Sequence, residues 1–166
     1  MNMLKTKFLI FIAIVISIFL IGIGSVFIYQ SVEIATKNNK FTKLKFTKLE
    51  LANTYEKREK GLMSRKNMCD NCGMLFEFSD YKSRSFWMKD TLIPLDIIFI
   101  NKTGQITNIC KNMAPLDIST SCQSNQPVQY VLETNPKYLE SRGIDIDSFI
   151  DIENLKTQAQ NYDWNF

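Results

Sequence analysis

The longest apolar stretch beyond the N-terminal segment runs from Phe86 to Ile100, and it contains two charged residues, Lys89 and Asp96. Burying a charge is costly unless it is paired or hydrated. Pro94 divides the stretch, because proline lacks the N–H that a sheet ladder needs. The pattern predicts two short strands joined by a turn. Asp96 begins the second strand, and the two charged side chains face each other across one hollow.

Alternating apolar positions predict further strands. Leu44 and Phe46 alternate, as do Leu49 and Leu51, but the two pairs have opposite parity, which predicts a bulge or break near residues 47–48. The apolar residues at 74, 76 and 78 predict a strand that ends in a turn at 79–83. Three more strands are predicted at 105–111, after a hairpin turn at 101–104, at 130–133 and at 144–152.

Capping residues predict two short helices. Asn53 or Thr54 can begin a helix at about 54–60, and Gly61 can end it. Asn135 and Gly143 bracket a second helix in the same way. Residues 113–127 are polar and form a long predicted loop, and the tail 153–166 has little apolar content and is expected to be loosely held.

These elements predict one mostly β domain at 41–152, an antiparallel β sandwich or barrel with two short helices. A transmembrane helix at 1–30 and a polar linker at 31–40 are expected to precede it. The uncharged run Phe8–Ile28 spans roughly 30 Å as a helix, the thickness of the hydrocarbon core of a bilayer. A cleaved signal peptide would have a shorter apolar core. We expect an uncleaved membrane anchor.

The orientation of this anchor rests on two opposing features. Lysines follow the apolar run as well as precede it, and charge counting alone would place the domain inside the cell. A short basic head is typical of a signal-anchor, and four cysteines suit an oxidising compartment. We therefore expect a single-pass protein of the cell membrane with its domain on the extracytoplasmic side.

The amino-acid composition excludes several classes of partner and catalytic site. The net charge is only +3 and the basic residues are scattered, so nucleic acid is not an expected partner. The 166-residue chain has no histidine, which excludes serine–histidine and cysteine–histidine catalysis and histidine-ligated metal sites. We expect no cofactor and no metal.

The four cysteines allow three disulfide pairings, and we expect Cys69–Cys72 with Cys110–Cys122, the second of which would hold the polar loop. Two alternatives remain open. The Cys-x-x-Cys spacing at 69–72 also fits a thiol–disulfide exchange site, although such sites lie at a helix N-terminus and this one precedes a predicted strand. A four-cysteine zinc site would need two closely spaced pairs.

Five charged residues are candidates for one polar pocket, in which arginine side chains would bind a carboxylate or phosphate through their forked donors. The competing interpretation is a set of structural ion pairs at strand ends. Trp87 and Met74 are expected in the core rather than in a binding site. The candidate ligand-binding residues are Arg58, Arg65, Lys89, Asp96 and Glu133.

Five motifs in this order resemble the family known as domain of unknown function 192, over nearly all of 41–152. They are Arg-Glu-Lys-Gly-Leu-Met-Ser-Arg at 58–65, Gly-Met-Leu-Phe-Glu-Phe at 73–78, Phe-Trp-Met-Lys-Asp-Thr at 86–91, Pro-Leu-Asp-Ile-Ile-Phe at 94–99 and Tyr-Val-Leu-Glu at 130–133. The resemblance implies a compact β-rich domain, often behind a signal or anchor segment, and no established reaction. The Cys69–Cys72 pair departs from the common form of the family.

Two functional hypotheses follow. The first is a membrane-tethered domain that binds a small polar or anionic ligand or a protein partner as an accessory module. The second is an enzyme, either a thiol oxidoreductase that uses Cys69 and Cys72 or a hydrolase that uses Asp96 with Lys89.

Overall fold

A computed structural model of the chain describes residues 23, 25, 26 and 40–160. The chain divides into two compact units, 1–40 and 41–166. Ile23, Ser25 and Val26 are helical; the rest of the predicted anchor Phe8–Ile28 and nearly all of the predicted linker lie outside the described residues. Within the described part of the chain, no helix combines the length and the apolar character needed to cross a bilayer.

The second unit is mostly β, with two short α-helices between residues 41 and 160. Its elements in chain order are β1 (Phe41–Thr42), β2 (Lys48–Ala52), α2 (Tyr55–Lys60), β3 (Cys72–Lys82), β4 (Ser85–Phe86), β5 (Leu95–Ile100), β6 (Ile106–Met113), β7 (Cys122–Gln123), β8 (Val128–Thr134), the 3₁₀ helix η1 (Glu140–Arg142), β9 (Phe149–Ile150) and α3 (Ile152–Gln160).

A five-stranded sheet in the order β2-β3-β8-β5-β6 forms the centre of the domain. β2 pairs with β3 in parallel, whereas β3–β8, β8–β5 and β5–β6 are antiparallel. The prediction of a mostly β domain with two short helices is confirmed, whereas an all-antiparallel sheet and a closed barrel are wrong: the sheet is mixed, and β2 and β6 are its open edges. The parallel pair arises because α2 lies in the connection from β2 to β3, the crossover that a parallel pair needs.

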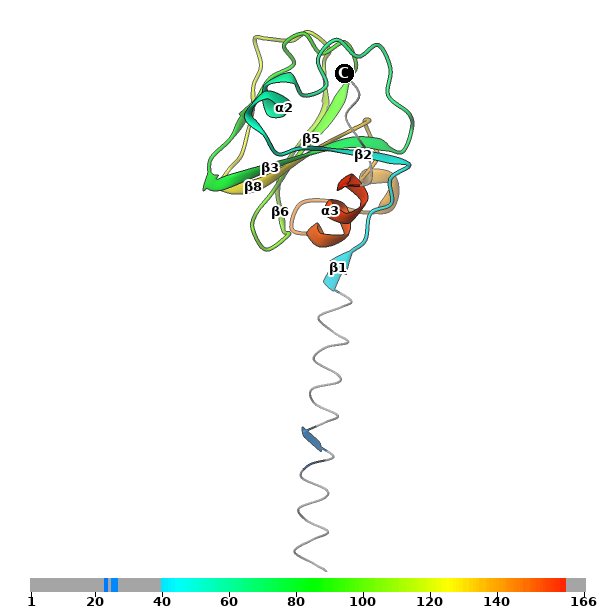
Figure 1. Cartoon of the computed structure of the whole chain (residues 1–166), viewed down its shortest axis with the longest axis vertical. Helices are drawn as coiled ribbons and strands as arrows, with labels where there is room; N and C mark the ends of the chain where they lie inside the picture. The colour runs from blue at the N-terminus through cyan, green and yellow to red at the C-terminus, as the bar shows by residue number, and fades with distance from the viewer. Residues whose placement is uncertain (1–22, 24, 27–39, 161–166) are drawn as a thin grey trace, which may run out of the picture. The chain divides into compact units, whose positions relative to one another are not determined.

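Each face of the sheet carries its own apolar core, so side chains alternate between two layers along every strand. On β5, Ile98 and Ile100 face the core that includes Leu155 of α3. Ile97 and Phe99 face the core on the side of α2. Figure 1 shows α2 and α3 on opposite sides of the sheet. β5 is fully buried for this reason, as its near-continuous apolar sequence predicted.

The C-terminal segment differs most from the prediction. The half-buried strand expected at 144–152 is reduced to β9, because residues 144–148 form turns, and the second predicted helix is reduced to turns and η1, which Gly143 ends with φ +65°. The expectation of a loosely held tail is wrong up to residue 160: α3 buries Leu155 and Ala159 completely or nearly so. Gln158 also binds the backbone of Leu44 and Phe46. Residues 161–166 lie outside the described part.

Several local predictions are confirmed. Thr54 caps α2 and Gly61 ends it, with φ +47°. The break near 47–48 is the gap between β1 and β2, and the turn at 101–104 joins β5 to β6. The turn predicted at 79–83 is wrong for most of its length, because β3 continues to Lys82, with an irregularity between Glu77 and Lys82.

Candidate functional site

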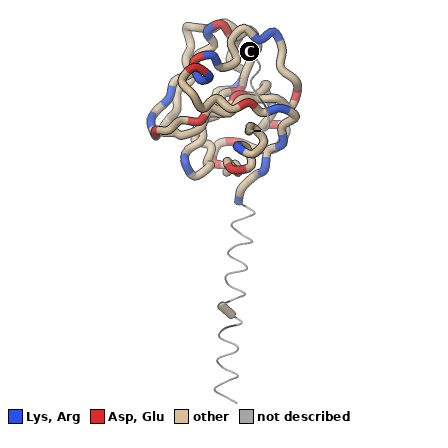
Figure 2. The backbone as a smooth tube through the Cα atoms, viewed as in Figure 1, with Lys and Arg blue, Asp and Glu red and all other residues tan. Residues whose placement is uncertain are grey.

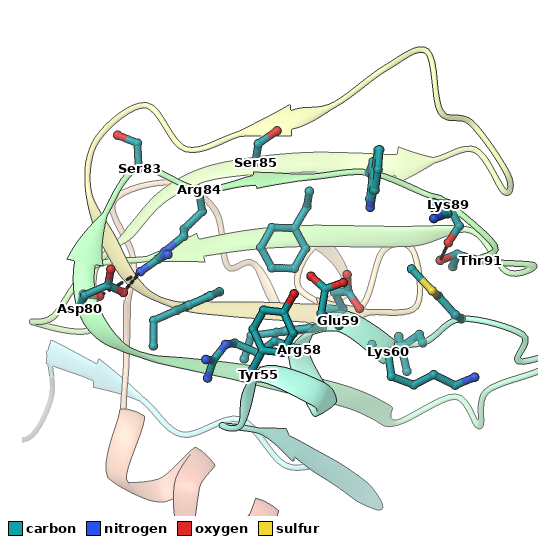
Figure 3. Close-up of a pocket in the computed structure, with 18 of the residues that line it drawn as sticks. Tyr55, Arg58, Glu59, Lys60, Asp80, Ser83, Arg84, Ser85, Lys89 and Thr91 are labelled. Carbon is teal, nitrogen blue, oxygen red and sulfur yellow. Dashed lines mark hydrogen bonds and ion pairs between the residues drawn. The ribbon is translucent and has the colours of Figure 1, made fainter. Parts of the chain in front are cut away.

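An open groove of about 630 Å³ lies on the α2 face of the sheet. One wall is α2 with the residues that follow it, and the other is β4 with the segment 87–91. Figure 3 shows Tyr55 and Glu59 of α2 on one side, Arg84 and Ser85 on the other, and Lys89 at one end. The groove thus gathers residues from three separate parts of the chain: 55–63, 76–91 and Glu133.

Aromatic packing and a disulfide fix the β4 wall. The ring of Phe86 packs edge to face against Phe76, with centroids 5.0 Å apart, and against Phe99 at 6.0 Å. β4 pairs with β7, where Cys122 lies opposite Phe86. Cys122 is bonded to Cys110 of β6, as predicted. The disulfide therefore joins the edge of the central sheet to the strand pair that forms this wall of the groove.

Two acidic residues lie on the apolar face of the sheet beneath the groove. Glu50 of β2 and Glu133 of β8 both align with Met74 of β3, and Ile97 of β5 continues the row. The two acidic residues are about 10 Å apart along the sheet, because neighbouring strands are spaced by about 4.8 Å. Both are at least 94% buried. A sheet face that is otherwise apolar thus carries two carboxyl groups.

Arg65 neutralises only one of them. Its Nη1 and Nη2 donate to Oε1 and Oε2 of Glu50 at 2.5 and 2.6 Å, a forked ion pair. Burial of Glu50 opposes ionisation, but the hydrogen bonds and charge of Arg65, with Lys48, outweigh it and lower the pKa of Glu50. Because both Nη atoms of Arg65 already bond to Glu50, Arg65 cannot form the same forked ion pair with Glu133.

Glu133 is consequently a buried acid that lines the groove. Its carboxyl group makes no hydrogen bond within residues 40–160, and its exposed fraction is 5%. Burial raises its pKa to about 8, and the charge of Arg65 opposes that rise only in part. At neutral pH the group is mostly protonated, so it can both donate and accept a hydrogen bond.

The other end of the groove is a stack of two guanidinium groups on one ring. Arg84 lies 3.8 Å from the ring centroid of Phe78, and Arg58 lies 5.2 Å from it. Arg58 donates to the backbone oxygen of Glu77 at 3.0 Å, and Arg84 pairs with Asp80. Hydrogen bonds from Lys82 and Arg84 lower the pKa of Asp80 to about 2. Arg58 forms no ion pair among the described residues.

The five predicted site residues separate into three groups. Arg58, Lys89 and Glu133 line the groove, and Arg65 acts on Glu133 from beside it. Asp96 lies elsewhere: on β5 it shares the parity of residues that face the α3 core, and it accepts hydrogen bonds from the backbone N–H groups of Asn112 and Lys137 at 2.7 and 2.8 Å.

The predicted meeting of Lys89 with Asp96 is therefore wrong. Lys89 lies over the ring of Trp87, at 5.6 Å from its centroid, on the opposite side of the sheet. The carboxylate of Asp96 needs no cation because two backbone donors already satisfy it.

The Cys69–Cys72 disulfide is present, as predicted. It closes a short loop before β3, and the side chain of Asn135 donates to the backbone oxygen of Cys69 at 2.7 Å. Cys69 is exposed and Cys72 is buried. The pair lies at the start of a strand rather than at a helix N-terminus. No cluster of metal-ligating residues occurs within the part of the chain that the structure describes.

Sequence reasoning missed three groove residues. Met74 is in the core, as expected, but Trp87 is 55% exposed and lines the groove. Tyr55 is 68% exposed on the opposite wall. Tyr55 is the first residue of α2, between the capping Thr54 and a run of charged residues, and this exposed setting could have indicated a binding residue. Arg84 gave no signal, because its role depends on the contact with Phe78.

Comparison with known proteins gives a family but no activity. The profile of the DUF192 family, described as uncharacterized ACR, matches residues 33–152. A crystal structure of a proposed transcription regulator from Sinorhizobium meliloti 1021 is 38% identical, with a TM-score of 0.58, and the match covers 61% of this chain and 78% of that one.

A crystal structure of a protein of unknown function from Novosphingobium aromaticivorans is 36% identical, with a TM-score of 0.59, over 62% of this chain and 73% of that one. The chain matches none of the curated proteins with which it was compared.

Proposed function

The chain belongs to the DUF192 family, and from that premise we propose that its β domain binds a small polar ligand with an anionic group in the groove between α2 and β4. The observation that carries this proposal is Glu133. Its carboxyl group makes no hydrogen bond to the described residues and its oxygens are open to the groove, where the buried position still disfavours the charged form. A ligand that reaches the floor of the groove would supply the missing partner.

The charges around the groove favour an anionic group on that ligand. Four cationic residues line it, against two acidic residues besides the mostly protonated Glu133. Lys89 is exposed, and Arg58 has free donor positions beyond its bond to a backbone oxygen. A carboxylate beside either of them would gain hydrogen bonds to a charged donor.

Binding of small acids by the full chain in detergent tests the proposal. The probes are a series of monocarboxylates, dicarboxylates and sugar acids, and the readout is the rise in unfolding temperature followed by titration calorimetry. Lys89→Met and Lys102→Met each remove one positive charge, but only Lys89 lines the groove. We expect Lys89→Met to weaken binding about tenfold, the effect of losing one hydrogen bond to a charged group, and Lys102→Met to leave it unchanged. Equal affinities of the two variants would refute the proposed site.

Neither enzymatic alternative has comparable support. A hydrolase built on Asp96 and Lys89 requires the two side chains to meet, and they lie on opposite sides of the sheet. Thiol exchange at Cys69 and Cys72 would lack the helix N-terminus that lowers a thiol pKa. Thiol titration tests the second: bridges that a mild dithiol opens in the folded protein would favour redox activity.

We also propose that residues 8–28 anchor the chain in the cell membrane, with the domain on the extracytoplasmic side. The two disulfides support an oxidising compartment. Protease added to intact cells should remove the domain, and alkaline washing should leave the anchor in the membrane. A domain protected until the cells are lysed would contradict this orientation.

A nucleic-acid partner has no support from the charge distribution. In the view of Figure 2, lysine and arginine residues alternate with acidic residues along the domain instead of gathering in one stripe. The description of the relative from Sinorhizobium meliloti as a proposed regulator therefore contributes nothing to the function proposed for this chain.

A further inference from the structure

Two exposed aromatic side chains face the groove from opposite walls. Tyr55 of α2 is 68% exposed, and Trp87 beyond β4 is 55% exposed. Large aromatic side chains usually bury most of their surface, and exposed ones are typical of binding surfaces. Figure 3 shows Tyr55 directed into the groove. Both side chains therefore offer ring surface to whatever the groove holds, and the Nζ of Lys89 lies over the ring of Trp87 at 5.6 Å from its centroid.

Two hydroxyl residues and one carboxyl group also line the groove. Ser85 and Thr91 line the groove with Glu133, and Thr91 donates its own hydrogen bond to the backbone oxygen of Lys89 at 3.1 Å. The oxygen of Thr91 can therefore still accept, and the carboxyl group of Glu133 can donate and accept. Hydroxyl groups of a ligand have the same double capacity, so they complement this set.

We propose that the ligand is an acidic sugar, of the uronic acid class. Its ring would lie against Tyr55 or Trp87, its hydroxyl groups would bond to Glu133 and the neighbouring hydroxyls, and its carboxylate would lie near Lys89 or Arg58. This inference rests on the function proposed above and adds the class of ligand.

The two acidic residues of the groove favour a carboxylate over a phosphate. Glu59 and Asp80 line the same groove as the four cationic residues. A phosphate monoester carries about two negative charges at neutral pH, as a phosphorylated side chain does, and both acidic residues would repel it. Each uronic acid unit carries one charge at a fixed position on its ring, which a single cation of the groove can neutralise.

Three probes of different chemistry test the ligand class on the full chain in detergent. They are digalacturonate, cyclohexanecarboxylate as an acid without hydroxyl groups, and a nucleoside monophosphate as an aromatic anion. Binding is measured by titration calorimetry, and saturation-transfer NMR reports whether sugar C–H protons contact the protein. We expect digalacturonate to bind at least tenfold more tightly than the other two.

Aromatic variants give the matched comparison. Trp87→Ala and Tyr55→Ala should each weaken digalacturonate binding about tenfold, and Trp87→Phe should retain most of it because a ring remains. Tyr81→Ala removes an exposed aromatic residue that does not line the groove, and it should have no effect.

The outcomes separate the two proposals. If cyclohexanecarboxylate binds as well as digalacturonate and the aromatic variants bind normally, the sugar inference is wrong and the anion-binding groove stands. Tighter binding of the nucleotide also overturns the sugar inference. If none of the three probes binds and the small acids of the earlier series also fail, both proposals fall together.

Discussion

Replacing Glu133 by glutamine should remove a specific dependence of stability on pH. In the folded protein the carboxyl group has a pKa of about 8, against an ordinary value of 4.5. Between these values the folded state binds more protons than the unfolded state, so the free energy of unfolding falls as pH rises. From pH 5.5 to pH 8.5 the loss attributable to this one group is about 3 kcal/mol. Below pH 4.5 both states are protonated and the penalty disappears.

Urea denaturation at several pH values measures this effect in the wild type and in Glu133→Gln. The difference between their free energies of unfolding should grow with pH across this window, with the variant the more stable at pH 8.5. Glu59→Gln is the matched control, because Glu59 lies exposed on the same groove. Its pH dependence should follow that of the wild type. Parallel curves for the wild type and Glu133→Gln would show that Glu133 is ionised in the folded state, contrary to our reasoning.

Three further substitutions test the supports of the fold and the site. Arg65→Met should lower the free energy of unfolding in urea by about 3 kcal/mol, because it leaves the buried Glu50 without its cation. Adding Glu50→Gln to this variant should recover part of the loss. Additive losses from the two substitutions would contradict the pairing. Gly104→Ala should cost at least about 2 kcal/mol more than Gly143→Ala, since both have positive φ but only the first new Cβ would collide, with the carbonyl oxygen of Ile150 in β9. Leu155→Ala should lower the free energy of unfolding by about 3 kcal/mol, and a change under 1 kcal/mol would indicate that α3 is not packed.

Local sequence signals predicted local structure well. The cap at Thr54, one of the two predicted, and the stop at Gly61 agree with the predicted helix within one residue, because capping depends on atoms within one turn. β5 was recognisable because a strand covered on both faces is apolar at nearly every position. The disulfide between Cys110 and Cys122 was the preferred one of three possible pairings, and it is the one present.

Features that depend on distant partners could not be predicted in the same way. The tail was expected to be loose because its apolar residues are few, yet Leu155 and Ala159, four residues apart, form one stripe that the sheet covers. Asp96 lies near the start of a strand, as predicted, but the groups that bond to its carboxylate were not predicted. They are backbone N–H groups, which nearly every residue has, so the sequence does not single them out.

The parallel pairing of β2 with β3 is a feature of the sheet topology that the sequence could have predicted. A strand, a helix and a strand follow one another from Lys48 to Lys82. A helical connection of this kind usually joins parallel strands. The order of these three elements along the chain therefore favours a parallel pair over the antiparallel one that was expected.

The energetic cost of Glu133 is the strongest argument that the groove has a function. At pH 7 its burial lowers stability by about 3 kcal/mol, a large fraction of the 5–15 kcal/mol typical of a domain. Glutamine would fill the same space without a charge to desolvate, so packing alone does not explain a carboxyl group at this position. A ligand that bonds to the group in its protonated form would offset part of the cost, and binding should then raise the apparent pKa of Glu133 further. Stability, proton uptake and ligand affinity are thus linked through a single side chain.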